Sequence, residues 1–203
     1  QTALEPLHIQ YTYLDRTVSI INSTRNAFAG MTARARVYNI NGKQAWDSGD
    51  VSTGIAADGV KDLLRVPTGN YSTTYFLRLT LSVNGKVVSQ PTYWLSTASP
   101  AGDNPDYTAL QRLPQPTLKT TDTPLSDGTT VTHTITVTNS GSAVAFFVRV
   151  ALEKGTSGTE IAPILWSDNY LTLLPGETRT ITATYRPADL GSAPAQLVIH
   201  GFP

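Results

Sequence analysis

Residues 166–170 combine two aromatic rings with three polar side chains, a composition that suits contact with a sugar. Trp166 and Tyr170 flank Ser167, Asp168 and Asn169. Aromatic rings line small-molecule sites, and a few amide or carboxylate groups orient the ligand there. The same residues also suit a loop that caps one end of a β-sandwich, because Asp and Asn side chains bond turn amides. Two roles are therefore possible for this segment. One is a capping role, and the other is carbohydrate or interface contact by Trp166, Asp168, Asn169 and Tyr170.

The other two tryptophans differ in their surroundings. Trp46 follows a predicted hairpin turn and is a further candidate for carbohydrate or interface contact. Trp94 lies between Tyr93 and Leu95 inside a predicted strand, and we expect it in the core.

The carboxylates do not form a recognisable catalytic pair. Retaining glycosidases need two carboxyl groups about 5–5.5 Å apart across the bond they cleave. The chain has 4 glutamates, and each lies at the frayed start or beside turn residues: Glu5, Glu153, Glu160 and Glu177. We expect all of them to be solvated loop residues, and no catalytic residue is assigned.

Metal and cofactor chemistry is not indicated either. The chain has no cysteine, and its histidines, His8, His133 and His200, are far apart in sequence. Zinc sites draw their ligands from clustered Cys and His residues. No Gly-rich loop precedes a helix, as a phosphate-binding site requires. We predict no metal and no cofactor.

The net charge of the chain argues against two classes of binding partner. Lys and Arg number 15, Asp and Glu number 15, and the formal net charge is zero. Nucleic-acid binding requires a basic surplus, and electrostatic membrane anchoring requires a basic cluster, so neither partner is expected. The chain begins with Gln1 rather than Met, which indicates a mature or excised piece of a longer protein.

The elements that must position these side chains are strands. Threonine is abundant, at 30 residues, and β-branched residues favour pleated sheets. Apolar and polar residues alternate with period two in several segments, as in half-buried strands. In residues 75–83 the alternation predicts that Leu77 and Leu79 face the core while Phe76 and Arg78 face water. Residues 131–138 place His133 in the core row and threonines in the solvent row.

Turn signals divide the chain into two domains. Asn41-Gly42 and Asn84-Gly85 predict tight hairpin turns. Strand density falls in a Pro/Gly-rich linker that also contains a short predicted helix at residues 107–113. The sequence predicts an all-β protein of two tandem immunoglobulin-like antiparallel β-sandwiches, at residues 1–98 and 116–203, joined by a linker at 99–115.

Two triplets match the N-glycosylation acceptor pattern. They begin at Asn22 and Asn70, and they matter only if a eukaryotic cell secretes the chain.

Several strings resemble the exo-β-D-glucosaminidases of glycoside hydrolase family 2, in the β-sandwiches that follow the catalytic barrel. The related β-mannosidases share part of this pattern. The resemblance covers nearly the whole chain, and the strings are residues 5–11 (EPLHIQY), 72–77 (STTYFL), 93–97 (YWLST), 163–170 (PILWSDNY), 174–177 (LPGE) and 185–190 (YRPADL).

The resemblance implies a secreted parent enzyme that removes glucosamine from chitosan oligomers. Its catalytic glutamates lie in an upstream (β/α)₈ barrel and map to no residue of this chain. The chain is then a non-catalytic accessory pair that packs on the barrel and N-terminal domains and stabilises them. An apolar docking patch is expected on the first domain. The linker is shorter than the family's and has no Trp.

Other hypotheses remain open. The chain is alternatively a free-standing carbohydrate-binding module that contacts chitosan oligosaccharides through Trp46, Trp166 and Tyr170, or the accessory domains of a β-mannosidase. A surface-stalk protein and a complete enzyme are further alternatives.

Overall fold

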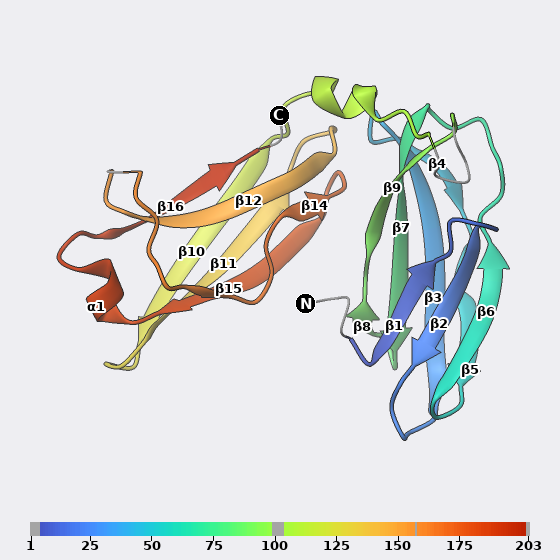
Figure 1. Ribbon diagram of the computed structural model, residues 1–203, viewed down its shortest axis with the longest axis horizontal. Coiled ribbons are helices and arrows are strands. Elements are labelled where there is room, and N and C mark those ends of the chain that lie inside the picture. Colours follow the sequence, from blue (N-terminus) through green and yellow to red (C-terminus); the bar gives the residue numbers. More distant parts are fainter. Residues whose placement is uncertain (1–4, 99–103, 157, 202–203) are drawn as a thin grey trace. The chain divides into compact units, whose positions relative to one another are not determined.

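The computed structural model describes residues 5–98, 104–156 and 158–201. It divides into two compact units, Gln1–Arg112 and Leu113–Pro203. Each unit has two layers of antiparallel strands, which confirms the predicted all-β class with two tandem sandwiches (Figure 1). Residues 99–103 of the predicted linker lie outside the described part of the chain.

The segment that follows those residues is tied to unit 1. The Thr74 hydroxyl donates to the Asp106 carbonyl at 2.8 Å, and the Asp106 amide donates to the Ser96 hydroxyl at 3.0 Å. The short helix predicted at residues 107–113 is a 3₁₀ helix, Thr108–Arg112. Its Leu110 is buried.

Unit 1 pairs a three-stranded sheet with a six-stranded sheet. The first has the order β1-β2-β6, and the second has the order β4-β3-β7-β8, with β5 added to β3 and β9 added to β7. The strands are β1 (Leu7–Tyr11), β2 (Thr17–Asn22), β3 (Phe28–Asn39), β4 (Gln44–Asp47), β5 (Val51–Ile55), β6 (Gly59–Arg65), β7 (Thr74–Val83), β8 (Lys86–Ser89) and β9 (Thr92–Ser96). The β7–β8 turn has φ of 49° at Asn84 and 79° at Gly85, the two positive values that its Asn-Gly dipeptide predicts.

The core of unit 1 lies between these sheets. Leu77, Leu79 and Leu81 are fully buried in it, as the alternation of β7 predicts. The opposite row was expected to face water, and for its first half this is wrong, because Phe76 and Arg78 are also buried. Periodicity separates the two faces of a strand but does not show whether both are covered.

Trp94 was expected in the core, and this is also wrong. Leu95 is buried in the core and Tyr93 packs against it, so the alternation of β9 directs Trp94 to the outer face of the sheet. There Trp94 is paired in register with Phe76 and is 38% exposed.

Unit 2 is a smaller sandwich of the same kind. Its sheets have the orders β10-β11-β15-β13 and β14-β12-β16. The elements are β10 (Leu118–Ser126), β11 (Val131–Asn139), β12 (Ala145–Lys154), β13 (Leu165–Trp166), β14 (Leu171–Leu173), β15 (Thr178–Tyr185), the short helix α1 (Pro187–Leu190) and β16 (Ala195–His200). The core contains Ile135, Val137 and Ile181. His133 is buried as expected, with Nδ1 2.8 Å from Asp122 Oδ2 and Nε2 3.2 Å from the Tyr185 hydroxyl.

The solvent row of β11 forms a threonine ladder with β15. The hydroxyl of Thr132 lies 3.0 Å from that of Thr184, Thr136 lies 3.1 Å from Thr180, and Thr138 lies 2.9 Å from Thr178. Paired hydroxyls of this kind stabilise a sheet across its strands. The predicted polar face of this strand is confirmed.

In each unit, a buried asparagine is the last residue of one strand. Asn22, at the end of β2, donates from Nδ2 to the carbonyls of Asn26 and Ala56 at 2.8 and 2.7 Å. Asn139, at the end of β11, donates to the carbonyls of Ala143 and Leu173 at 2.7 and 3.0 Å. In both cases the amide oxygen accepts from the backbone two residues on. This correspondence is not visible as a sequence repeat.

We expect Asn139→Ala to destabilise unit 2 by about 2–4 kcal/mol, because it leaves two carbonyls and one amide without their partner. Urea denaturation of the full chain measures this, with Trp46→Phe and Trp94→Phe introduced so that fluorescence reports Trp166 in unit 2. The neighbouring Ser140→Ala removes only an exposed hydrogen bond and serves as the control. A loss below about 0.5 kcal/mol for Asn139→Ala would contradict the assignment.

Candidate functional site

The strand β12 carries a bulge that pushes an aromatic ring outward. Ala145 pairs with Leu173 and Val148 pairs with Leu171, so two residues of β12 oppose one residue of β14. Within the bulge Phe146 is buried, whereas Phe147 is 40% exposed and has φ of 54°. A positive φ at a bulky residue is a genuine outlier, and it costs about 1–2 kcal/mol.

Tyr170 has the same backbone strain and lies against Phe147. Its φ is also 54°, its side chain is 52% exposed, and the two ring centroids are 5.3 Å apart. Strained residues persist only where their surroundings hold them in place, and they cluster at functional sites. Two strained, exposed aromatics in contact therefore mark this place as a candidate site.

Asn169 supplies the support that holds Tyr170. Its Oδ1 accepts from the Val150 amide at 2.8 Å, and its Nδ2 donates to the Val150 carbonyl at 2.8 Å. The side-chain amide thus pairs with β12 as a strand residue would. The same Oδ1 accepts from the Tyr170 amide at 2.9 Å, and Asp168 accepts from the Asn169 amide at 2.9 Å. Asp168 and Asn169 therefore bond backbone groups at the turn.

Charged side chains continue the same face of β12. Arg149 forms an ion pair with Glu160. The hydrogen bond that Arg149 donates to Glu160, with a smaller contribution from Tyr170, raises the pKa of Arg149. His200 is paired in register with Arg149, and its Nε2 lies 3.9 Å from Glu153 Oε1.

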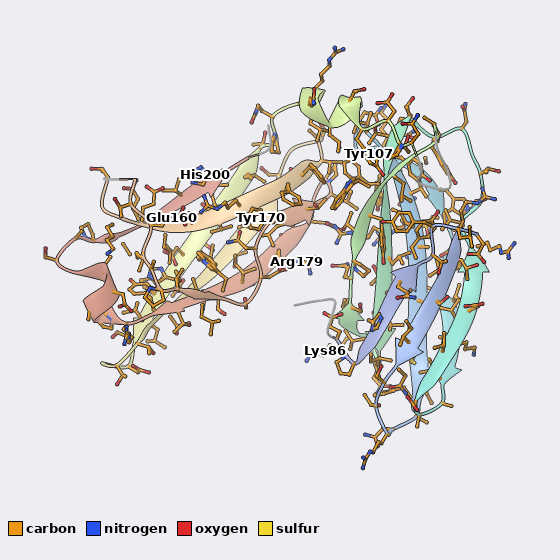
Figure 2. All side chains as sticks on the ribbon, viewed as in Figure 1. Lys86, Tyr107, Glu160, Tyr170, Arg179 and His200 are labelled. Atoms are coloured by element: carbon orange, nitrogen blue, oxygen red, sulfur yellow. The ribbon has the colours of Figure 1, made fainter. Side chains whose placement is uncertain are left out.

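We name this face the β12 strip. Its residues are Phe147, Arg149, Glu153, Glu160, Tyr170 and His200. Figure 2 shows Glu160, Tyr170 and His200 beside β12. The two aromatic rings are inclined at 49° and do not form one flat platform. Tyr170 presents the more exposed ring and lies beside Arg149, whose guanidinium pairs with Glu160.

Glu153 was expected in a solvated loop, and this is wrong. It is the second-last residue of β12, its side chain is 13% exposed, and it forms a bridge with Glu160 on the facing segment. Glu160 lies beside the Arg149 guanidinium, and Glu153 lies beside the His200 imidazole. The strip therefore offers hydrogen-bonding groups that a ligand or a protein partner can contact.

The tryptophans named from the sequence are placed differently from Tyr170. Trp46 is partly buried and packs against the core of unit 1. Trp166 is partly buried, packs against the core of unit 2, and pairs with Ala183 of β15. The structure brings Asp168, Asn169 and Tyr170 together, while Trp46 lies in the other unit.

Unit 1 has an aromatic cluster of its own. The rings of Tyr11, Tyr13 and Tyr93 lie within 5.4–6.1 Å of one another, and the Tyr93 hydroxyl accepts from the Tyr11 amide. Tyr13 is 46% exposed and Leu14 is 86% exposed. The apolar docking patch expected on the first domain stays a prediction, and these two side chains are where it would lie.

Two further features concern ligands and membranes. Among residues 5–98, 104–156 and 158–201, no group of three or more His, Asp or Glu side chains is arranged to hold a metal ion. No helix within the described part of the chain is long and apolar enough to cross a membrane.

Comparison with known proteins assigns the family. Residues 94–202 match the model described as the exo-beta-D-glucosaminidase Ig-fold domain. The chain belongs to this family. Residues 15–98 match the mannosidase Ig/CBM-like domain. The resemblance drawn from the sequence strings and the immunoglobulin-like class of both sandwiches are confirmed.

Relatives and solved structures agree with this assignment. An exo-beta-D-glucosaminidase of Streptomyces avermitilis is 37% identical over 95% of this chain and 24% of its own length. The crystal structure of an exo-chitosanase from Amycolatopsis orientalis superposes with a TM-score of 0.87 at 34% identity, covering 98% of this chain and 26% of that one. A beta-D-mannosidase from Dictyoglomus thermophilum shares the fold, with a TM-score of 0.61 at 16% identity. The chain thus spans about a quarter of the length of these glucosaminidase-family proteins.

Of the six residues of the β12 strip, sequence reasoning named only Tyr170 as a candidate site residue. Phe147 and Arg149 lie in an apolar run, FFVRVAL, that gives no sign of a bulge. Glu160 is 11 residues from Arg149, and only the fold brings them together. The one usable signal was the Asp-Asn pair before Tyr170, which indicates a turn.

At position 147 we expect the glycine variant to be more stable than the alanine variant, which reverses their usual order in a strand. Phe147→Gly should be about 1 kcal/mol more stable than Phe147→Ala, because glycine adopts positive φ without strain. Urea denaturation of unit 2 measures the difference. At the buried, regular position 151 of the same strand, Ala151→Gly should instead be destabilising. An alanine variant at 147 as stable as the glycine variant would show that the backbone there is unstrained.

Proposed function

We propose that this chain is the pair of non-catalytic C-terminal accessory domains of a secreted exo-β-D-glucosaminidase that degrades chitosan oligosaccharides. Its role is to pack on the (β/α)₈ catalytic barrel and the N-terminal domains of that hydrolase and to stabilise them.

One observation carries this proposal. Relatives described as exo-beta-D-glucosaminidases match 95–98% of this chain at 37% identity, while the match occupies only 21–24% of their own length. The remaining three quarters leave ample room for a catalytic domain. Glucosaminidase parentage is favoured over β-mannosidase parentage, because the β-mannosidase match reaches only 16% identity.

The exposed surfaces support a packing role. Interfaces are enriched in tyrosine, phenylalanine and arginine, and depleted in charge at their centre. The β12 strip offers Phe147, Arg149 and Tyr170, and unit 1 offers Tyr13 and Leu14. A chain with 15% charged residues also has less charge than most soluble domains, which is consistent with surface that is covered in the parent enzyme.

Carbohydrate binding is a second candidate, favoured by one feature of unit 2. The Tyr170 ring is 52% exposed beside Arg149, and Arg149 with its partner Glu160 supplies hydrogen-bond donors and acceptors. Affinity for chitosan oligosaccharides at this ring would make the chain a binding module as well as a support.

The test is reconstitution from two parts. The remainder of the parent hydrolase is expressed without this segment, and the 203-residue chain is added separately. We expect the thermal midpoint and the activity half-life of the truncated enzyme to rise with the concentration of added chain, because a partner that binds only the folded state stabilises it. The chain alone should release no glucosamine from chitosan oligosaccharides.

The Phe147→Ser/Tyr170→Ser variant serves as the matched comparison. Stabilisation that is lost with this variant places the docking surface on the β12 strip, and stabilisation that persists places it elsewhere. Calorimetry with chitosan oligosaccharides separates the second candidate, since binding abolished by Tyr170→Ser would assign a sugar site. If the wild-type chain leaves the truncated enzyme unchanged at saturating concentration, the accessory role is wrong.

A further inference from the structure

The outer face of the larger sheet in unit 1 carries a row of polar side chains. Alternation along β3 turns Ala33 and Ala35 into the core and turns Thr32, Arg34 and Arg36 outward. The register with β7 sets Ser82 opposite Thr32, Thr80 opposite Arg34, and Arg78 opposite Arg36. A pocket of about 310 Å³ lies over this row, lined mainly by Thr32, Arg34, Arg36, Asp50, Thr80 and Ser82.

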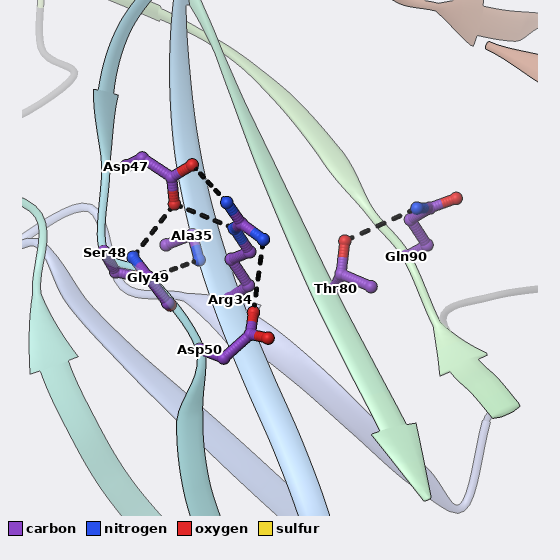
Figure 3. A network of polar contacts seen from close by, with 8 residues as sticks. All are labelled: Arg34, Ala35, Asp47, Ser48, Gly49, Asp50, Thr80 and Gln90. Atoms are coloured by element: carbon purple, nitrogen blue, oxygen red, sulfur yellow. Dashed lines mark hydrogen bonds and ion pairs between the residues drawn. The ribbon is translucent and has the colours of Figure 1, made fainter. Parts of the chain in front are cut away.

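Arg34 lines the pocket, and two aspartates hold its guanidinium (Figure 3). Its Nε and Nη2 donate to the two oxygens of Asp47 at 2.9 and 2.6 Å, and its Nη1 donates to Asp50 at 3.3 Å. The hydrogen bond from Arg34, with another from the Gly49 amide, lowers the pKa of Asp47. Both aspartates near the pocket are therefore partners of a single arginine.

The hydrogen bonding of Arg36 differs from that of Arg34. Asp47 is its cross-strand neighbour in register, but both Asp47 oxygens bond Arg34. Arg36 Nε is buried, and no acceptor for it lies among the residues that the structure describes. Directly opposite on β7 is a second cation, the fully buried Arg78. Like charges set opposite one another destabilise a sheet.

Arg34 and Arg36 thus lie side by side on this face, and the two carboxylates printed against them, Asp47 and Asp50, both bond Arg34. An anion at Arg36 would accept a hydrogen bond from its buried Nε. The fork of a guanidinium matches a carboxylate by two parallel hydrogen bonds. The hydroxyls of Thr32, Thr80 and Ser82 offer neutral donors and acceptors to the rest of the ligand.

We propose that this pocket binds a carboxylate group, with Arg36 as the residue that receives it. The volume suits a small ligand. The carboxylate comes either from a soluble sugar acid or from an Asp or Glu side chain of another polypeptide segment. The site is separate from the β12 strip and does not depend on the glucosaminidase role.

The test is an NMR titration of the 203-residue chain, observed at the Arg36 Nε–Hε resonance. Sodium glucuronate is the probe, with glucose and with sodium chloride at equal ionic strength as references. We expect a saturable shift with glucuronate alone. Arg36→Gln should weaken binding by at least about tenfold, because a charge-assisted hydrogen bond is lost. Arg25→Gln removes an exposed charge in the same unit and should leave binding unchanged.

Asp50→Asn gives an independent measurement if Arg36→Gln fails to fold. Asp50 lines the pocket and its side chain is 63% exposed, so its removal should be tolerated. Loss of its negative charge should tighten glucuronate binding by about twofold or more. Unchanged or weaker binding by Asp50→Asn, or a shift that sodium chloride reproduces, would overturn the proposal.

Two short peptides identify the source of the carboxylate. Capped Gly-Asp-Gly is compared with capped Gly-Asn-Gly and with glucuronate. Tighter binding of glucuronate assigns a sugar acid, tighter binding of the Asp peptide assigns a protein side chain, and equal binding assigns the bare carboxylate. If neither glucuronate nor the Asp peptide saturates the Arg36 resonance, the pocket is not a carboxylate site.

Discussion

Burial of apolar side chains between two sheets is the interaction on which each unit depends. The chain has no cysteine, so no disulfide ties the facing sheets together. Burial of Leu77, Leu79 and Leu81 in unit 1, and of Ile135 and Ile181 in unit 2, must supply that attachment. Period-two alternation then determines which side chains are left for the outer faces. Those faces are where both candidate sites lie.

The two units use their outer faces differently. Unit 2 covers one sheet with paired threonine hydroxyls, which satisfy one another. On its other sheet a bulge and a side-chain amide hold two strained aromatics outward. Unit 1 instead places Arg36 on an outer face where the two neighbouring aspartates, Asp47 and Asp50, both bond Arg34. The threonine hydroxyls of unit 2 thus bond one another, whereas in unit 1 the buried Nε of Arg36 has no acceptor among the residues that the structure describes.

Sequence alone predicted the features that follow from local chemistry. The threonine rows, the Asn-Gly turn at Asn84 and the strand content follow from residue type and spacing. It failed where a second layer or an irregularity decides the outcome. Phe76 and Arg78 alternate as solvent residues should, yet they are covered. Phe147 turns outward because two residues of β12 lie opposite one residue of β14. The sequence of β12 alone does not show where its partner strand has one residue fewer. Arg149 meets Glu160 only through the fold.

The buried asparagine of unit 1 has a consequence for how the protein is produced. Asn22 begins a glycosylation triplet, but it is 1% exposed and both of its amide hydrogens are bonded to carbonyls. A glycan added there during synthesis in a yeast or insect cell could not be accommodated in the folded sandwich. Asn70 begins the other triplet and is exposed. Bacterial expression avoids this conflict. In a eukaryotic secretory host, chains glycosylated at Asn22 would not fold, and only chains without that glycan would reach the native state.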